Sequence, residues 1–122
     1  MNRRGFTLIE IMISLVILAI AILGLATTTG QFMHVVTTGQ ARAAATQLAE
    51  QRIEQILMDP NYATIDTAYA KTETSFPGLT GYTRVTTVVW VNDSLNYKRV
   101  TVVVIPPTVT DTIKRTIMVA AP

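Results

Sequence analysis

The stretch FTLIEIMISLVILAIAILGLA, from Phe6 to Ala26, decides the fold of this chain. Its 21 residues are long enough to cross a bilayer as one helix. Thirteen of them are Phe, Leu, Ile or Val, and together these favour membrane insertion by about 4–8 kcal/mol. Glu10 is the one charged residue in the stretch, and such a charge costs about 2.5–3.5 kcal/mol at mid-membrane. The sequence therefore predicts a membrane-spanning helix that tolerates Glu10 and a partner that neutralises its charge.

Composition limits the remaining possibilities. The chain has 122 residues, enough for one domain. Its net charge of +2 is due to Arg3 and Arg4, because the other basic and acidic residues balance at eight each. No basic footprint for nucleic acid is visible. The chain has no Cys, which excludes disulfides and thiol chemistry. Arg3 and Arg4 before the apolar run favour a cytoplasmic N-terminus.

A second helical pattern follows the apolar run. Thr27–Gly30 is a weak helix-forming patch, but Gln31–Met58 again has apolar residues at three- and four-residue spacing. Asp59-Pro60 ends the pattern, since a proline disfavours helical geometry at the preceding residue. The predicted apolar stripe consists of Ala41, Ala45, Leu48, Ala49, Ile53, Ile56 and Leu57.

The C-terminal part reads as a small sheet. Asn61–Gly81 is polar and is predicted to be an irregular connector with a short helical turn near Ile65–Ala70. Three runs then have the composition or alternation of strands: Tyr82–Val91, Tyr97–Ile105 and Thr112–Ala120. Their short connections predict an antiparallel meander. We therefore expect an α+β fold in which the long N-terminal helix, membrane-spanning in its first half, packs on a three-stranded antiparallel sheet.

The stretch Gly5-Phe6-Thr7-Leu8-Ile9-Glu10, after a short basic leader, resembles the processing motif of type IV pilins and type II secretion pseudopilins. The resemblance implies that a prepilin peptidase cuts between Gly5 and Phe6 and that Phe6 is then N-methylated. It implies a leader (1–5), a transmembrane and assembly helix (6–26), an amphipathic continuation (27–59), a connector (60–81) and a sheet domain (82–122).

The resemblance also gives Glu10 a role. Cleavage creates an amine at Phe6 that is mostly cationic at neutral pH, and Glu10 of one subunit would pair with this amine on a neighbour. The expected partners are the inner membrane, the prepilin peptidase, other pilin or pseudopilin subunits and an assembly platform. The precursor is expected in the bacterial inner membrane with its C-terminal domain in the periplasm, and the mature subunit in a pilus or pseudopilus.

Two absences favour a subgroup of the resembled family. Many major pilins have Pro where this chain has Thr27, and many have a C-terminal disulfide loop; this chain has neither. The Ala-rich stretch Gln40–Glu54 and the strand Tyr97–Val102 look more like those of minor pilins and minor pseudopilins. The sequence is therefore interpreted as a minor structural subunit.

Two simpler interpretations of the N-terminus remain open. One is a secretory signal peptide cut near Ala19–Ala21 or Gly24–Ala26, although the apolar run is long for a signal core and contains Glu10. The other is an uncleaved anchor that carries a periplasmic domain. The second gives the alternative function: a membrane-anchored, non-polymerising envelope domain that binds a protein partner.

Other candidate residues favour structural roles. Asn92–Asn96 offers oxygen atoms that could hold calcium, but ordinary turn residues explain the cluster. His34 has no neighbouring His, Cys or carboxylate along the sequence, so we expect no metal site and no cofactor. Glu50 and Glu54 lie one turn apart with Arg52 between them, which predicts a solvated helix face. The serines lack a base partner in any recognisable arrangement, so the chain is not expected to be an enzyme.

Overall fold

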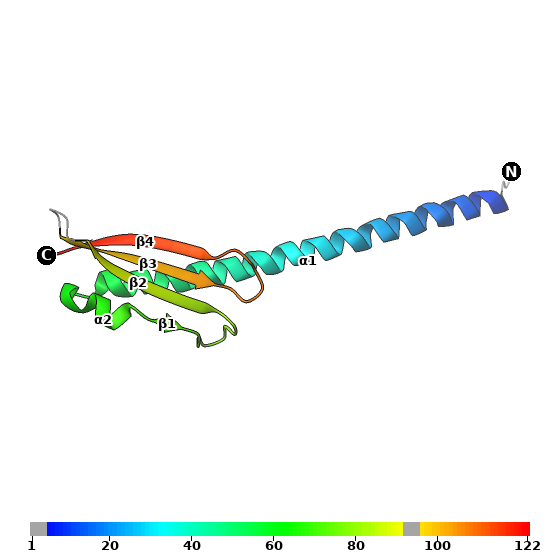
Figure 1. Ribbon diagram of the computed structural model, residues 1–122. Coiled ribbons are helices and arrows are strands. Elements are labelled where there is room, and N and C mark those ends of the chain that lie inside the picture. Colours follow the sequence, from blue (N-terminus) through cyan, green and yellow to red (C-terminus); the bar gives the residue numbers. More distant parts are fainter. Residues whose placement is uncertain (1–4, 92–95) are drawn as a thin grey trace. The chain divides into compact units, whose positions relative to one another are not determined.

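The computed structural model describes residues 5–91 and 96–122, which form two compact units. The first unit ends at Thr37, and the second comprises Thr38–Pro122. The elements, in chain order, are the helices α1 (Leu8–Met58), η1 (Tyr62–Thr64) and α2 (Ile65–Tyr69) and the strands β1 (Thr72–Glu73), β2 (Thr83–Val91), β3 (Tyr97–Ile105) and β4 (Ile113–Ala120) (Figure 1).

In the described part of the first unit, α1 is the only element, and every residue from Gly5 to Thr37 is exposed. This helix is long and apolar enough to cross a membrane, and its most apolar part contains no buried residue. The helix continues through the weak patch Thr27–Gly30. The hydroxyls of Thr27 and Thr28 donate hydrogen bonds to the carbonyl of Gly24, at 2.8 and 3.0 Å. These bonds satisfy polar groups that would be costly in an apolar environment.

The second unit contains a four-stranded antiparallel sheet in the order β1-β2-β3-β4. The three long strands lie where the sequence predicts them. The predicted count of three is wrong, because β1 adds two residues from the connector, with Thr72 opposite Val85 and Glu73 opposite Arg84. Two residues are too few to produce a recognisable alternation, so the sequence pattern could not reveal this strand.

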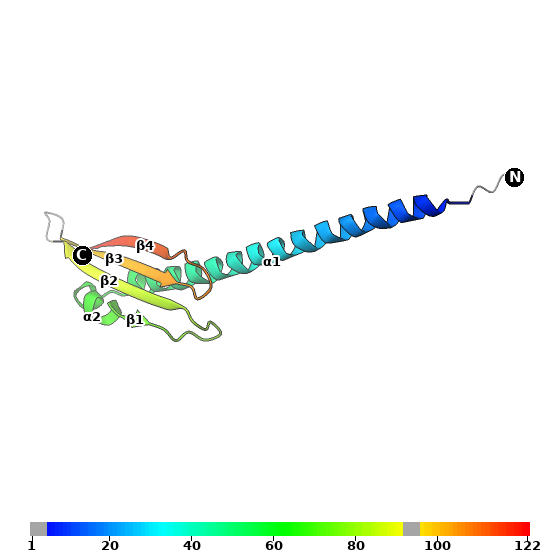
Figure 2. The same cartoon turned by 45° about the vertical axis from the view of Figure 1, so that its right-hand side comes forward.

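The part of α1 that belongs to the second unit covers one face of this sheet, as Figure 2 shows. On the sheet, Val100, Val102 and Val104 alternate along β3 and are fully buried. On the helix, Ala45 and Ala49 are fully buried and allow the helix to approach closely. The remaining buried core residues are Leu48, Ile56, Ile65 and Tyr82.

Two residues of α1 differ in burial from what the helix pattern predicts. Leu57 was expected in the apolar stripe but is 61% exposed. Arg52 was expected on the solvated face but is only 3% exposed. Arg52 lies between Leu48 and Ile56 on the face that covers the sheet, four residues from each. The helix thus presents a cation to the sheet where an apolar residue would be expected.

Candidate functional site

The start of α1 has the geometry of a helix cap. Thr7 precedes the first helical residue, and its Oγ1 accepts a hydrogen bond from the backbone N–H of Glu10 at 3.4 Å. The backbone carbonyl of Thr7 accepts from the N–H groups of Glu10 and Ile11, at 3.1 and 3.2 Å. Thr7 and Glu10 have the spacing of a capping box, in which a Thr is followed three residues later by a Glu. The helix therefore begins at Leu8 rather than at Phe6.

Glu10 lies on the exposed surface of this first turn. It lines a shallow groove of about 300 Å³ together with Phe6, Ile11, Ser14 and residues one turn further on. Within the described residues, no cationic side chain is close enough to form an ion pair with its carboxylate. Ser14 donates its hydroxyl to the backbone carbonyl of Glu10 at 2.8 Å, not to the carboxylate. The carboxylate thus faces outward from an apolar helix.

Gly5 and Phe6 precede the helix in non-helical conformation. A Cβ added at Gly5 would meet no atom within 4 Å, and its φ angle is not in the left-handed region. Neither backbone geometry nor packing against the described residues therefore requires glycine at this position. Arg3 and Arg4, the basic residues of the leader, lie outside the described residues.

In the second unit, a cluster of charged side chains holds the helix to the sheet. The carboxylate of Glu73 accepts hydrogen bonds from Arg52 on α1 and from Arg84 Nε on β2, the latter at 2.9 Å. Arg84 Nη1 also donates to the backbone carbonyl of Leu48 at 2.9 Å and to Gln51 Oε1 at 3.4 Å. Burial disfavours the charged form of Glu73, but the hydrogen bonds from both guanidinium groups outweigh this effect and lower its pKa.

Another charged cluster holds α2 against the sheet. The ammonium of Lys98, on β3, donates to the backbone carbonyls of Tyr62 and Ala63 and to Asp66 Oδ1, at 2.8, 3.1 and 3.1 Å. The hydrogen bond from Lys98 lowers the pKa of Asp66. Lys98 also lies 4.8 Å from the ring centroid of Tyr62. This cluster is structural, because each donor of Lys98 is already used within the fold.

The remaining sequence candidates do not form a site in the described parts. Asn92–Leu95, most of the loop considered for calcium, lies outside the described residues. Asn96 is described, and its Oδ1 accepts a hydrogen bond from Trp90 Nε1 at 2.7 Å. Within residues 5–91 and 96–122, no group of three or more His, Cys, Asp or Glu side chains could hold a metal ion. His34 lies on the exposed part of α1.

Sequence reasoning missed the cluster of Arg52, Arg84 and Glu73. Its members lie 11–32 residues apart, and each is an ordinary charged residue in its local context. Glu73 lies in the strand that the pattern did not predict, so no local signal indicated where its carboxylate would point. A buried Arg in the middle of an apolar stripe is visible only once the helix phase is fixed by the structure.

Comparison with known families agrees with the start of the chain. Residues 1–26 match the family model of the prokaryotic N-terminal methylation motif. No curated protein and no solved structure matches this chain. The motif, the long apolar helix and the antiparallel sheet give the chain a pilin-like architecture, consistent with the type IV pilin-like family. The motif marks the chain as a substrate of prepilin peptidase and as a pilin-like precursor. The long apolar helix is consistent with a membrane-anchored precursor.

Proposed function

We propose that this chain is a structural subunit, not an enzyme, of a type IV pilus or a type II secretion pseudopilus. It is made as an inner-membrane precursor with a cytoplasmic N-terminus and a periplasmic C-terminal domain. Prepilin peptidase cuts it between Gly5 and Phe6, and Phe6 is N-methylated. The mature chain then leaves the membrane and joins other subunits at an assembly platform.

The position of Glu10 is the observation that carries this proposal. Its carboxylate is exposed on a helix whose neighbouring side chains are uncharged and mostly apolar, and no cation of the described residues pairs with it. An unpaired carboxylate in a bundle of apolar helices is costly. The amine freed at Phe6 of an adjacent subunit supplies the missing positive charge. Because the pair forms only at one axial stagger, its main contribution is specificity rather than net stability.

Gly5 supports the same proposal from the other side of the cut. No contact with the residues that the structure describes explains a glycine there, and a protease that binds an extended segment closely can require one. A minor rather than a major role is supported by Thr27, which stands where many major pilins have Pro, and by the lack of cysteines for a C-terminal disulfide loop.

Substitution of Glu10 tests the proposal. Glu10→Ala should still insert into the membrane and be cut after Gly5, but should be lost from sheared filaments. Ser14→Ala is the matched control, because it changes the same groove one turn later and removes only a hydrogen bond to a backbone carbonyl. Mass spectrometry of the filament fraction should find a chain that starts at methylated Phe6.

The alternative, a non-polymerising membrane-anchored domain, predicts different results. The chain would then start at Met1 in the membrane fraction, would not appear in filaments, and would be indifferent to Glu10→Ala. Filaments built normally from the Glu10→Ala chain would contradict the pairing mechanism.

A further inference from the structure

The charges of the second unit are unevenly partnered. Ion pairs join Arg42 to Asp111 and Lys98 to Asp66, and Glu73 is shared by three cations. Among the described residues of this unit, the carboxylates left without an ion pair belong to α1 and the residue after it: Glu50, Glu54 and Asp59. The cations left without one belong to β3 and β4: Arg99, Lys114 and Arg115. The unpaired charges are thus negative on and next to α1 and positive on β3 and β4.

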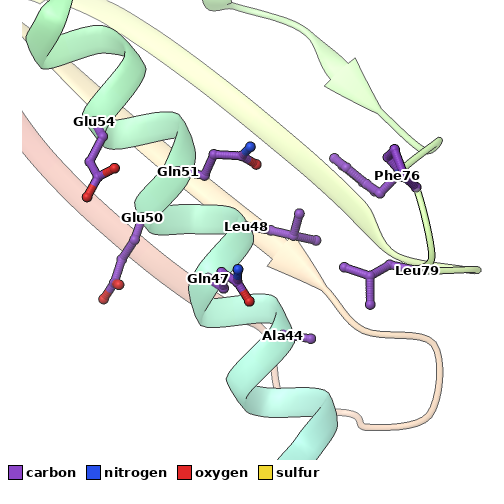
Figure 3. Close-up of a pocket in the computed structure, with 9 residues that line it drawn as sticks. Ala44, Gln47, Leu48, Glu50, Gln51, Glu54, Phe76 and Leu79 are labelled. Atoms are coloured by element: carbon purple, nitrogen blue, oxygen red, sulfur yellow. The ribbon is translucent and has the colours of Figure 1, made fainter.

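The acidic side borders a groove of about 500 Å³, which we call the helix–turn groove. Figure 3 shows Leu48 pointing from α1 toward Phe76 and Leu79, while the side chains of Glu50 and Glu54 point away from these two residues, along the outer side of the helix. The apolar lining consists of Ala44, Leu48, Phe76, Pro77 and Leu79. The polar lining consists of Gln47, Glu50, Gln51 and Glu54.

The wall of the helix–turn groove is preformed. The backbone N–H of Leu79 donates to the carbonyl of Phe76 at 3.2 Å, and Gly78 between them has a φ of 75°. Pro77 followed by such a glycine gives a type II turn, which holds Phe76 and Leu79 close together. Arg84 lies 5.0 Å from the ring centroid of Phe76 and so braces the turn against the sheet. Little conformational freedom would therefore be lost when a partner binds.

The basic side carries a matching apolar anchor. Met118, on β4, is 64% exposed and lies directly opposite Arg99 on β3. Lys114 is on the same face of the sheet, since it is four residues before Met118. This face is the one that α1 does not cover, because the buried Val102 is paired with Arg115 on the other face. The exposed sheet face therefore presents Met118 beside Arg99 and on the same strand as Lys114, with the exposed apolar side chains of Val89 and Ile105 on the same face.

We propose that the helix–turn groove of one subunit receives the exposed β3–β4 face of a second copy of this chain. Met118 enters the apolar lining, and Arg99 and Lys114 meet the carboxylates of Glu50 and Glu54. The two surfaces are different patches of the same chain, so the contact is heterologous, and repeated heterologous contacts extend into open helical assemblies. The inference rests on the proposed filament function and adds the contact between outer domains.

The contact need not be strong by itself. Subunits whose membrane helices are already bundled hold their outer domains at high effective concentration, so a modest interface is occupied. Its complementary charges serve mainly to select the correct orientation. The inference requires that at least two copies of the chain meet, so a minor role would concern the proportion of this subunit in the filament rather than single occupancy.

Disulfide trapping tests the contact directly, because the chain has no cysteine of its own. The full-length chain carrying both Gln47→Cys, beside the groove, and Thr116→Cys, on the exposed sheet face, is oxidised in assembling cells. A heterologous contact should give a ladder of dimers, trimers and longer species. Each single-cysteine chain should give no ladder. The matched control pairs Gln47→Cys with Arg115→Cys, which points from the opposite face of β4 and should give no ladder.

Charge reversal tests the chemistry of the same contact. Glu50→Lys with Glu54→Lys, or Arg99→Glu with Lys114→Glu, should reduce the ladder at least about tenfold, because like charges would then face each other. Combining all four changes should restore it. Arg115→Glu, a control with the same charge change on the other sheet face, should leave the ladder unchanged. Unfolding followed by Trp90 fluorescence verifies that each variant is folded.

The possible failures are distinguishable. Filaments that contain the processed chain but give no ladder, or a ladder insensitive to charge reversal, would overturn this contact and leave the proposed function standing. Cross-linking to a protein of different mass in place of the ladder would overturn the second copy as the occupant. A chain that keeps its first five residues and never enters filaments would overturn the proposed function and this contact together.

Discussion

Residues 5–37 and residues 38–122 both contain many apolar side chains, but they satisfy them differently. In the second unit the apolar residues of α1 and of the sheet bury one another, and Val100, Val102 and Val104 are fully buried. In the first unit every side chain is exposed, although the helix is far more apolar. A contiguous exposed apolar surface of this kind indicates a partner outside the chain. The second unit thus supplies its own core, whereas the first depends on a membrane or on other subunits.

The carboxylates of Glu73 and Glu10 show the same contrast between the two units. Glu73 accepts hydrogen bonds from Arg52 and Arg84 and lies 3.9 Å from Lys71 Nζ, all within one unit. Glu10 has no such neighbour among the described cations. A carboxylate whose partners are internal stabilises a fold, whereas one whose partner is external reports on assembly. Mutations at the two positions should therefore separate stability from function.

The largest expected effect on stability is that of Glu73→Ala. Arg52 and Arg84, whose side chains are only 4% and 5% exposed, would lose their shared carboxylate. Leaving buried charges without a partner costs about 3–5 kcal/mol, so the midpoint of urea unfolding, followed by Trp90 fluorescence, should fall sharply. Glu10→Ala should leave this midpoint unchanged. Equal losses of stability in the two variants would contradict the contrast between the units.

A conservative core substitution should give a smaller effect. Ile56→Val removes one methylene from a side chain that is 1% exposed and should cost about 0.5–1.5 kcal/mol. Ile17→Val makes the same change on the first unit, where the side chain is 62% exposed. It should not alter unfolding of the second unit measured in detergent. A matching loss from Ile17→Val would show that the first unit contributes to the stability of the second.

The smallest effect concerns pH. The folded-state pKa values of Glu73 and Asp66 lie below their ordinary values of 4.5 and 3.8. The stability that these groups contribute is therefore fully present above those ordinary values and is lost as the pH falls through the lower folded values. Unfolding midpoints measured from about pH 6 down to about pH 3 should decrease. Glu73→Gln should flatten this dependence, and an unchanged slope in that variant would assign it to other groups.

How much the sequence could predict follows from the range of each signal. The start of α1 and the processing motif are contiguous, so residues 5–10 carried the information by themselves. Alternation along β3 is equally local, and its strand lies where expected. The strand β1 and the burial of Arg52 could not be predicted, because both depend on contacts between residues far apart in the sequence. Arg52 is buried because Glu73 lies beside it and because its side of α1 faces the sheet. Leu57 was misplaced for the same reason: Ile56 and Leu57 point about 100° apart on the helix, and the sequence pattern does not show which of them faces the sheet.

The cap at Thr7 has a consequence for maturation. The hydroxyl and carbonyl that close the first turn belong to a residue on the retained side of the proposed cut. Trimming the precursor therefore removes none of the groups that nucleate α1, and Phe6 becomes a short non-helical terminus ahead of an intact first turn. The new amine is presented at the positive end of the helix dipole, where a cation is disfavoured. A nearby anion would therefore stabilise this amine as soon as it forms, and this stabilisation favours association of the cleaved chain with another subunit.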